Sequence, residues 1–263
     1  MRKTLIGIIF VFVFPLFWGT SVFAGEVASS SIEKTPSKKE MRQALKDLVK
    51  DKAFLGKINP YPEGTKKGEY FNDFSKSLFS SDLIITKLVD AIFEYQGKNI
   101  DIVKLSKAWL YEKMKIGFVK LPYDDLTRYF EIYTMLLDNS ETIDECAQLA
   151  SGDTSDFYEI IGKLDDDVLN SWLKLVYNAV NYGLKTDEPS SLSKEQEEIA
   201  WEILFSNASK YEVSTFNRVI KNLDTSTKSE SCWLGVFMFG KLQTMNGEPK
   251  KWLTHSMINS MFK

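Results

Sequence analysis

The side chains that most often carry catalysis or bind metals are scarce in this chain of 263 residues, which contains two cysteines and one histidine. The histidine, His255, lies close to the C-terminus within KWLTHSMINSMFK. A zinc site built from Cys146, Cys232 and His255 would need a carboxylate as its fourth ligand, which structural zinc sites seldom use. Motifs of the types HExxH, Walker, Rossmann, GxSxG, EF-hand and CxxC are absent. We therefore predict no metal site, no cofactor and no identifiable catalytic residue.

Paired carboxylates are the remaining route to catalysis, because a glycan-cleaving enzyme needs only two acids in one cleft. The local acidic clusters are Asp124-Asp125, Asp153 with Asp156, and Asp165 to Asp167. Each lies where a helix is expected to begin, and negative charge is favoured there by the helix dipole. We interpret them as helix-start residues, and an all-α envelope hydrolase that uses paired carboxylates stays an alternative.

The two cysteines, Cys146 and Cys232, are predicted to form a disulfide. An even number of cysteines in an exported chain is expected to pair where the compartment is oxidising. The bond requires the two α-carbons to lie within about 7 Å of each other. The alternative is two buried free thiols that act as small apolar side chains.

The first 24 residues have the order of a signal peptide. Arg2 and Lys3 precede an apolar run from Leu5 to Trp18, and Val22-Phe23-Ala24 offers a cleavage site. Cleavage would remove two basic residues and no acidic residue, so the formal charge would change from −3 to −5. The alternative is a retained membrane anchor, because the apolar stretch can be extended to about 20 residues. We expect a periplasmic or secreted protein that neither binds nucleic acid nor stays inserted in a membrane.

Apolar residues recur at helical spacing through most of the chain, and no run of strict alternation is found. Two stripes are especially clear, each on one face of an expected helix. The first consists of Leu126, Tyr129, Phe130, Tyr133, Leu136 and Leu137, and the second of Val168, Leu169, Trp172, Leu175, Val176 and Ala179. The pattern predicts an all-α fold.

Capping signals and turn residues divide the chain into about ten helices. Ser37 with Glu40 and Ser193 with Gln196 have the spacing of capping boxes, which predicts helices that begin near residues 38 and 194. After a flexible segment at 25–36, we predict one compact domain over 37–263, either an irregular bundle or stacked helical hairpins. A break between two subdomains is possible near 183–192.

The segment CWLGVFMF, from Cys232 to Phe239, carries no charged side chain and is followed by Gly240. Periodicity cannot distinguish a buried strand from a helix buried on all sides over so short a stretch. We predict a helix in the core, because the flanking segments have helical spacing. The functional alternative is a helix that lines an apolar cavity near 232–245, which would make the protein a carrier.

The segment from Gly56 to Gly68 is predicted to be the longest connection and an exposed loop. Within it, Tyr61 stands between Pro60 and Pro62, an arrangement that could present the ring to a protein partner. The alternative is a ring folded back onto its own domain.

These patterns together favour a non-enzymatic, exported helical protein that binds another macromolecule in the cell envelope. An inhibitor or immunity protein and a subunit of an envelope complex are the two forms that fit best. The expected partner is a protein, with the hydrolase and the carrier as alternatives.

Overall fold

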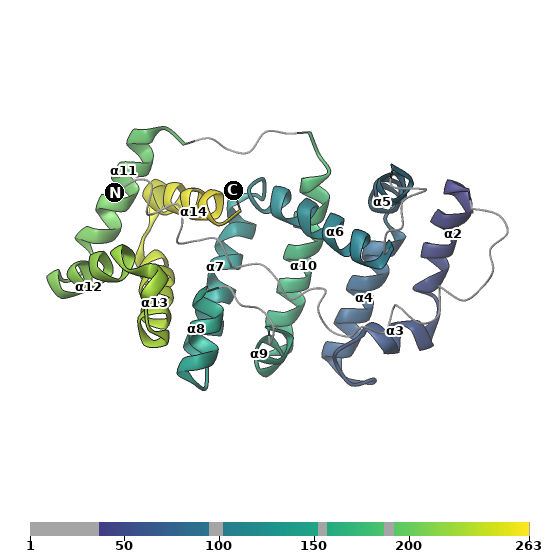
Figure 1. Cartoon of the computed structure of the whole chain (residues 1–263), viewed down its shortest axis with the longest axis horizontal. Helices are drawn as coiled ribbons and strands as arrows, with labels where there is room; N and C mark the ends of the chain where they lie inside the picture. Colours follow the sequence, from purple (N-terminus) through teal and green to yellow (C-terminus); the bar gives the residue numbers. More distant parts are fainter. Residues whose placement is uncertain (1–36, 95–101, 152–156, 187–191, 263) are drawn as a thin grey trace. The chain divides into compact units, whose positions relative to one another are not determined.

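The computed structural model describes residues 37–94, 102–151, 157–186 and 192–262. Within these ranges the chain forms thirteen α-helices and one short 3₁₀ helix, and no residue belongs to a strand (Figure 1). The all-α prediction is therefore confirmed. The predicted signal peptide at 1–24 and the segment at 25–36 lie outside the described residues. No described helix is both long enough and apolar enough to cross a bilayer.

The helices separate into two compact units that alternate along the sequence. The described part of one unit comprises residues 37–94, 102–117 and 165–186, and we call it unit A. The other comprises 118–151, 157–164 and 192–262, and we call it unit B. One change of unit occurs between residues 186 and 187, within the range named as a possible break. The expectation of a single compact domain stays a prediction.

Unit A contains six helices. They are α2 (Lys38–Leu48), α3 (Lys52–Ile58), α4 (Lys66–Ser80), α5 (Asp82–Glu94), α6 (Ile102–Phe118, up to Gly117) and α10 (Asp166–Gly183). Helix α4 packs most extensively against α10, and α2 packs mainly against α5. The predicted stripe from Val168 to Ala179 is buried throughout and forms the inner face of α10.

Two glycines let α6 and α10 approach until their backbones touch. A β-carbon at Gly117 would lie 1.6 Å from the carbonyl oxygen of Ala179, and one at Gly183 would lie 1.8 Å from that of Lys113. Any larger residue would overlap with a backbone atom, which has no rotamer through which to escape. Lys113 precedes Gly117 along α6, whereas their partners Gly183 and Ala179 occur in the reverse order along α10. The two helices therefore cross as an antiparallel pair.

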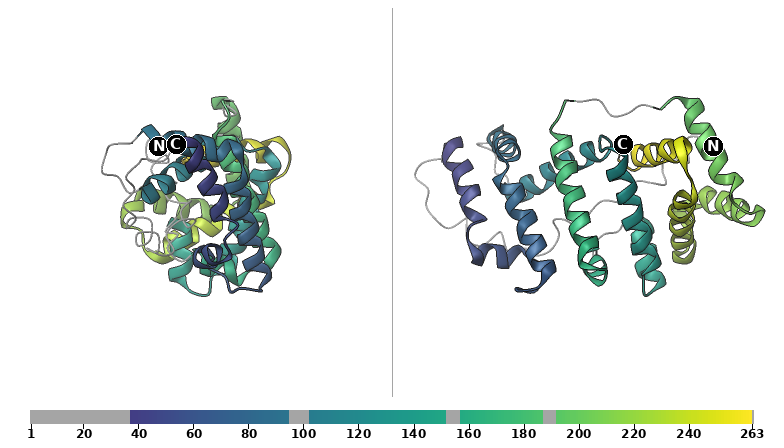
Figure 2. Two further views of the ribbon diagram at one scale, coloured as in Figure 1. Left: turned by 90° about the vertical axis from the view of Figure 1, so that its right-hand side faces the viewer. Right: turned by 180° about the vertical axis from the view of Figure 1, so that it is seen from behind.

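Unit B, whose C-terminal helices are drawn in green to yellow in Figure 2, contains seven α-helices and the 3₁₀ helix. They are α7 (Tyr123–Asp138), α8 (Ile143–Ser151), α9 (Phe157–Lys163), α11 (Lys194–Ser206), α12 (Lys210–Lys221), η2 (Leu223–Thr225), α13 (Lys228–Thr244) and α14 (Gly247–Phe262). Helix α13 packs against α8 and α7, and α14 packs against α11 and α7. The core of the unit therefore lies between α7, α13 and α14.

Aromatic rings fill this core. Tyr129 and Tyr133 of α7 are fully buried, with ring centroids 5.0 Å apart. The ring of Phe239 from α13 stacks on Tyr133 at 5.5 Å, and Phe262 from α14 stacks on Phe118 at 4.9 Å. Offset and edge contacts of this kind add to the free energy gained from burying the rings. The apolar stripe of α7 is thus the face on which the other helices pack.

The two predicted capping boxes form at the expected residues, Ser37 with Glu40 and Ser193 with Gln196. Two more boxes, Ser209 with Glu212 and Thr227 with Glu230, open α12 and α13. Neither of these two boxes was predicted from the sequence, and α12 begins at Lys210. Helix α3 was missed as well, because its seven residues are too few to show a clear period.

Candidate functional site

Cys146 of α8 and Cys232 of α13 form a disulfide, with their α-carbons 5.1 Å apart. The predicted pairing is confirmed. Farther along the same two helices, a β-carbon on Gly235 would lie 2.7 Å from the β-carbon of Ala150. The two contacts, Cys146 with Cys232 and Ala150 with Gly235, follow the same order along both helices. Helices α8 and α13 therefore run parallel, joined by the covalent bond and packed closely beyond it.

The segment from Cys232 to Phe239 forms part of α13, as predicted. Phe237, Met238 and Phe239 are buried, and the close contact of Gly235 with α8 leaves no space between these two helices. Val236, at 39% exposure, is the residue of this segment that faces solvent most. These contacts are those of a core helix, and the carrier alternative gains no support from them.

Tyr61 lies in a connection shorter than the predicted one, between the end of α3 at Ile58 and the start of α4 at Lys66. Its ring is half-buried and meets the edge of Phe71, with the centroids 6.3 Å apart. Burial raises the pKa of the Tyr61 hydroxyl. The Tyr61 backbone amide donates to the side-chain oxygen of Asn59 at 2.9 Å. The ring therefore has the folded-back arrangement, and a role in partner binding stays a prediction.

The acidic clusters lie at helix starts wherever they are described. Asp124 and Asp125 are in the first turn of α7, and Asp166 and Asp167 are in the first turn of α10. Asp166 pairs with Lys67 at 3.7 Å, within unit A. Asp153 and Asp156 lie outside the described residues. No described cluster brings two carboxylates together over a cleft.

His255 is half-buried on α14, and burial lowers its pKa. The next residue, Ser256, donates a hydrogen bond to a carboxylate oxygen of Glu197 at 2.5 Å, which ties α14 to α11. No hydrogen bond or ion pair joins His255 to another described residue, so the structure gives it no partner for acid–base chemistry. The described part of the chain also contains no group of three or more metal-ligating side chains.

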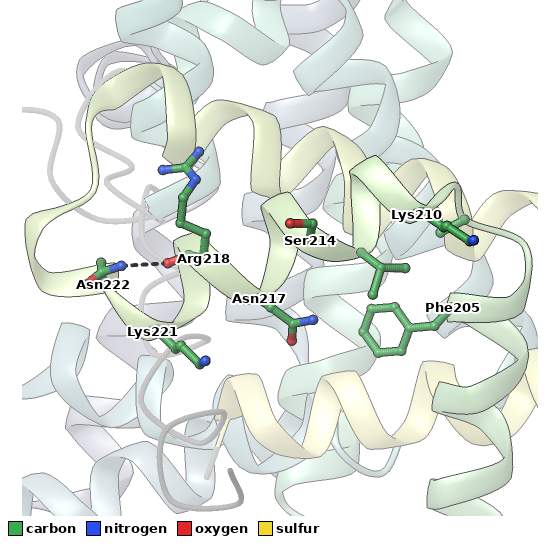
Figure 3. Close-up of a pocket in the computed structure, with 9 residues that line it drawn as sticks. Phe205, Lys210, Ser214, Asn217, Arg218, Lys221 and Asn222 are labelled. Atoms are coloured by element: carbon green, nitrogen blue, oxygen red, sulfur yellow. Dashed lines mark hydrogen bonds between the residues drawn. The ribbon is translucent and has the colours of Figure 1, made fainter.

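The described part of the chain contains an open pocket along α12, with a volume of about 770 Å³ (Figure 3). Its basic side chains are Lys210, Arg218 and Lys221. Neutral polar groups come from Ser214, Asn217 and Asn222, and apolar surface comes from Phe205, Ala208 and Val213. None of the lining residues is acidic.

Helical spacing explains why these residues face the same way. Lys210, Ser214, Asn217 and Lys221 stand at positions i, i+4, i+7 and i+11, which is one side of an α-helix. We call these four residues the α12 stripe. On the opposite side of the helix, Phe216, Val219 and Ile220 are buried and hold α12 against the rest of unit B. The stripe is exposed because the apolar residues of α12 occupy only the other face.

Charge compensation differs among the cations around α12. Arg218 forms an ion pair with Glu230, which lowers the pKa of that carboxyl to about 2. Lys241 pairs with Glu212 at 3.0 Å. By contrast, Lys210 and Lys221 form no ion pair with any described residue and are exposed. The two ends of the α12 stripe therefore carry positive charge that no described residue neutralises.

Sequence reasoning missed this site. The signals that could have found it are the spacing of Lys210, Ser214, Asn217 and Lys221 and the capping box at Ser209, which includes Lys210 in the helix. No protein-family model, curated protein or solved structure matches this chain, so no known family guides the interpretation of the pocket.

Proposed function

We propose that this chain is an exported, non-enzymatic helical protein that binds another macromolecule in the cell envelope, as an inhibitor or immunity protein or as a subunit of an envelope complex. The observation that carries the proposal is the exposed α12 stripe, whose two terminal lysines lack a partner within the described chain. Unneutralised charge on an open surface favours encounter with a partner of opposite charge.

The Cys146–Cys232 disulfide supports the exported location, since such bonds persist chiefly in oxidising compartments. It also supports binding, because it joins α8 covalently to α13, the helix on which α12 packs. A surface held on a rigid framework loses less conformational entropy when it binds. The pocket lining holds no carboxylate, so it offers no acid–base pair for the hydrolase alternative.

The location is tested by the intact mass of the exported protein. Cleavage after Ala24 would give a chain that begins at Gly25 with Cys146 and Cys232 oxidised. A mass that includes residues 1–24 would instead indicate an anchored protein, and two free thiols in the natively isolated protein would contradict the oxidising compartment.

Binding is tested by affinity purification of the full chain from envelope extract, with the partner quantified by mass spectrometry. We expect the partner to co-purify with the wild-type protein in a constant molar ratio. With Lys210→Glu/Lys221→Glu, the amount of co-purified partner should be lower. The matched control is Lys39→Glu/Lys52→Glu, which makes the same change of net charge at exposed lysines of unit A. Circular dichroism melting verifies that each variant is folded. Absence of any partner with the wild-type protein would refute the proposal.

A further inference from the structure

The α12 stripe has a defined length and a charge at each end. Its outer residues, Lys210 and Lys221, are eleven positions apart, so their α-carbons are separated by about 16 Å along the helix axis. Figure 3 places Lys210 beside Phe205 at one end of the pocket and Lys221 beside Asn222 at the other. The stripe can therefore contact two negative groups that are held apart on one partner.

The groups between the lysines suit a peptide. Ser214 and Asn217 are exposed and form no hydrogen bond with any described residue. A hydroxyl and a carboxamide can each donate and accept, which matches the alternating N–H and C=O groups of a polypeptide backbone. A phosphate-rich surface would present mainly acceptors, and donors such as lysine and arginine would serve it better.

Apolar surface borders the same stripe. Phe205 and Val213 line the pocket, and the ring of Phe205 meets the edge of Phe216 with the centroids 4.9 Å apart, which fixes its position. Tyr211, next to Lys210 in the sequence, is 75% exposed. Aromatic rings of this kind commonly act as anchors for apolar side chains of a protein partner. A polyanion without apolar groups would leave this surface uncovered.

We infer that the α12 stripe binds an acidic protein segment in which two carboxylate residues flank a backbone stretch with an apolar side chain. The carboxylates pair with Lys210 and Lys221, the backbone bonds to Ser214 and Asn217, and the apolar side chain lies against Phe205. This inference rests on the proposed function and adds to it the surface and the chemistry of the partner.

The first step of the test locates the contact. The variant Tyr211→p-benzoylphenylalanine keeps an aromatic ring beside the stripe and forms a cross-link with a bound partner on irradiation. The control is Lys174→p-benzoylphenylalanine, at an exposed site on α10. Mass spectrometry then identifies the attached segment. We expect a peptide that contains at least two acidic residues and one apolar residue, obtained from position 211 and not from position 174.

The second step is a charge exchange between the two proteins. Lys210→Glu/Lys221→Glu should raise the dissociation constant for the identified partner by at least about tenfold, because like charges then face each other. Replacing two acidic residues of the cross-linked segment by lysine should recover most of the lost affinity for this variant. The same replacement should weaken binding to the wild-type chain. Melting temperatures verify that the variants fold.

The outcomes separate the inference from the proposed function. If a partner co-purifies but position 211 captures nothing, or captures a glycan, a lipid or a segment without acidic residues, the inference is overturned and the proposed function survives. Unchanged affinity after Lys210→Glu/Lys221→Glu overturns the inference in the same way. If no partner co-purifies with the wild-type chain, the proposed function itself fails.

Discussion

Helices α12 and α13 follow each other in the chain and begin with the same capping device, yet they have different surroundings. Ser209 and Glu212 cap α12, and Thr227 and Glu230 cap α13. Apolar residues occupy one face of α12, so its other face meets solvent. In α13 they are distributed around the axis, so the helix lies against both α7 and α8. The cap determines where a helix begins, and the distribution of apolar residues determines whether it reaches the core.

The disulfide should produce the largest difference between the two helices, because it joins α13, and not α12, to α8. Replacement of both cysteines by Cys146→Ala/Cys232→Ala opens a loop of 86 residues and should lower the free energy of unfolding by about 4 to 5 kcal/mol. Urea unfolding of the variant and of the oxidised wild type measures this. Hydrogen exchange should speed up more in α13 than in α12, and equal acceleration would contradict the comparison.

A pair of glycines in α13 tests how closely this helix is packed. Gly235→Ala places a β-carbon 2.7 Å from that of Ala150, which cannot rotate away, so α8 and α13 must separate. We expect a loss of about 1 to 3 kcal/mol in the free energy of unfolding.

Gly240→Ala is the matched control, because a β-carbon there meets no atom within 4 Å. The helix interior should then gain up to about 1 kcal/mol from the alanine. Urea midpoints that shift in the same direction for both variants would mean that α13 is not held tightly against α8.

Loss of the capping residue should lower the free energy of unfolding by a similar amount in α12 and α13, although the two helices differ in burial. Ser209→Ala and Thr227→Ala each remove a side-chain acceptor from the first turn and should each cost about 1 kcal/mol. Chemical denaturation measures both. A much larger loss for Thr227→Ala would show that the start of α13 depends on the surrounding core rather than on its own cap.

The acidic members of the two caps should make stability depend on pH. Hydrogen bonds from Ser209 and the ion pair with Lys241 lower the pKa of Glu212 from 4.5 to about 2. The ion pair with Arg218 and the bonds from Thr227 lower that of Glu230 to about 2. Because the pKa is lower in the folded state, the stabilisation is present above about pH 4.5 and is lost as the pH falls toward 2.

Urea midpoints measured across this pH range test the effect of the two carboxyls. Glu212→Gln and Glu230→Gln should each reduce the decline in stability between pH 4.5 and pH 2. The matched control is Glu198→Gln on α11, whose carboxylate belongs to no capping box. A decline that neither cap variant alters would mean that these carboxyls do not control the acid response.

Much of the fold was predictable because helices are local structures. The apolar stripe from Leu126 to Leu137 and the boxes at Ser37 and Ser193 each depend on residues within a few positions of one another, and each was confirmed. The disulfide was predictable for a different reason, since two cysteines allow only one intramolecular pairing. The short helix α3 was missed because seven residues hardly complete two turns.

The candidate site was less predictable, because its properties come from residues that meet only in the folded chain. The sequence by itself determined that α12 would place Lys210, Ser214, Asn217 and Lys221 on one side, since helical spacing requires it. The sequence also indicated that this side would be exposed, because the apolar residues of α12 occupy the other face. Only the tertiary structure decided that Glu230 pairs with Arg218 while the two lysines have no ion-pair partner among the described residues, because charge pairing depends on contacts between separate helices.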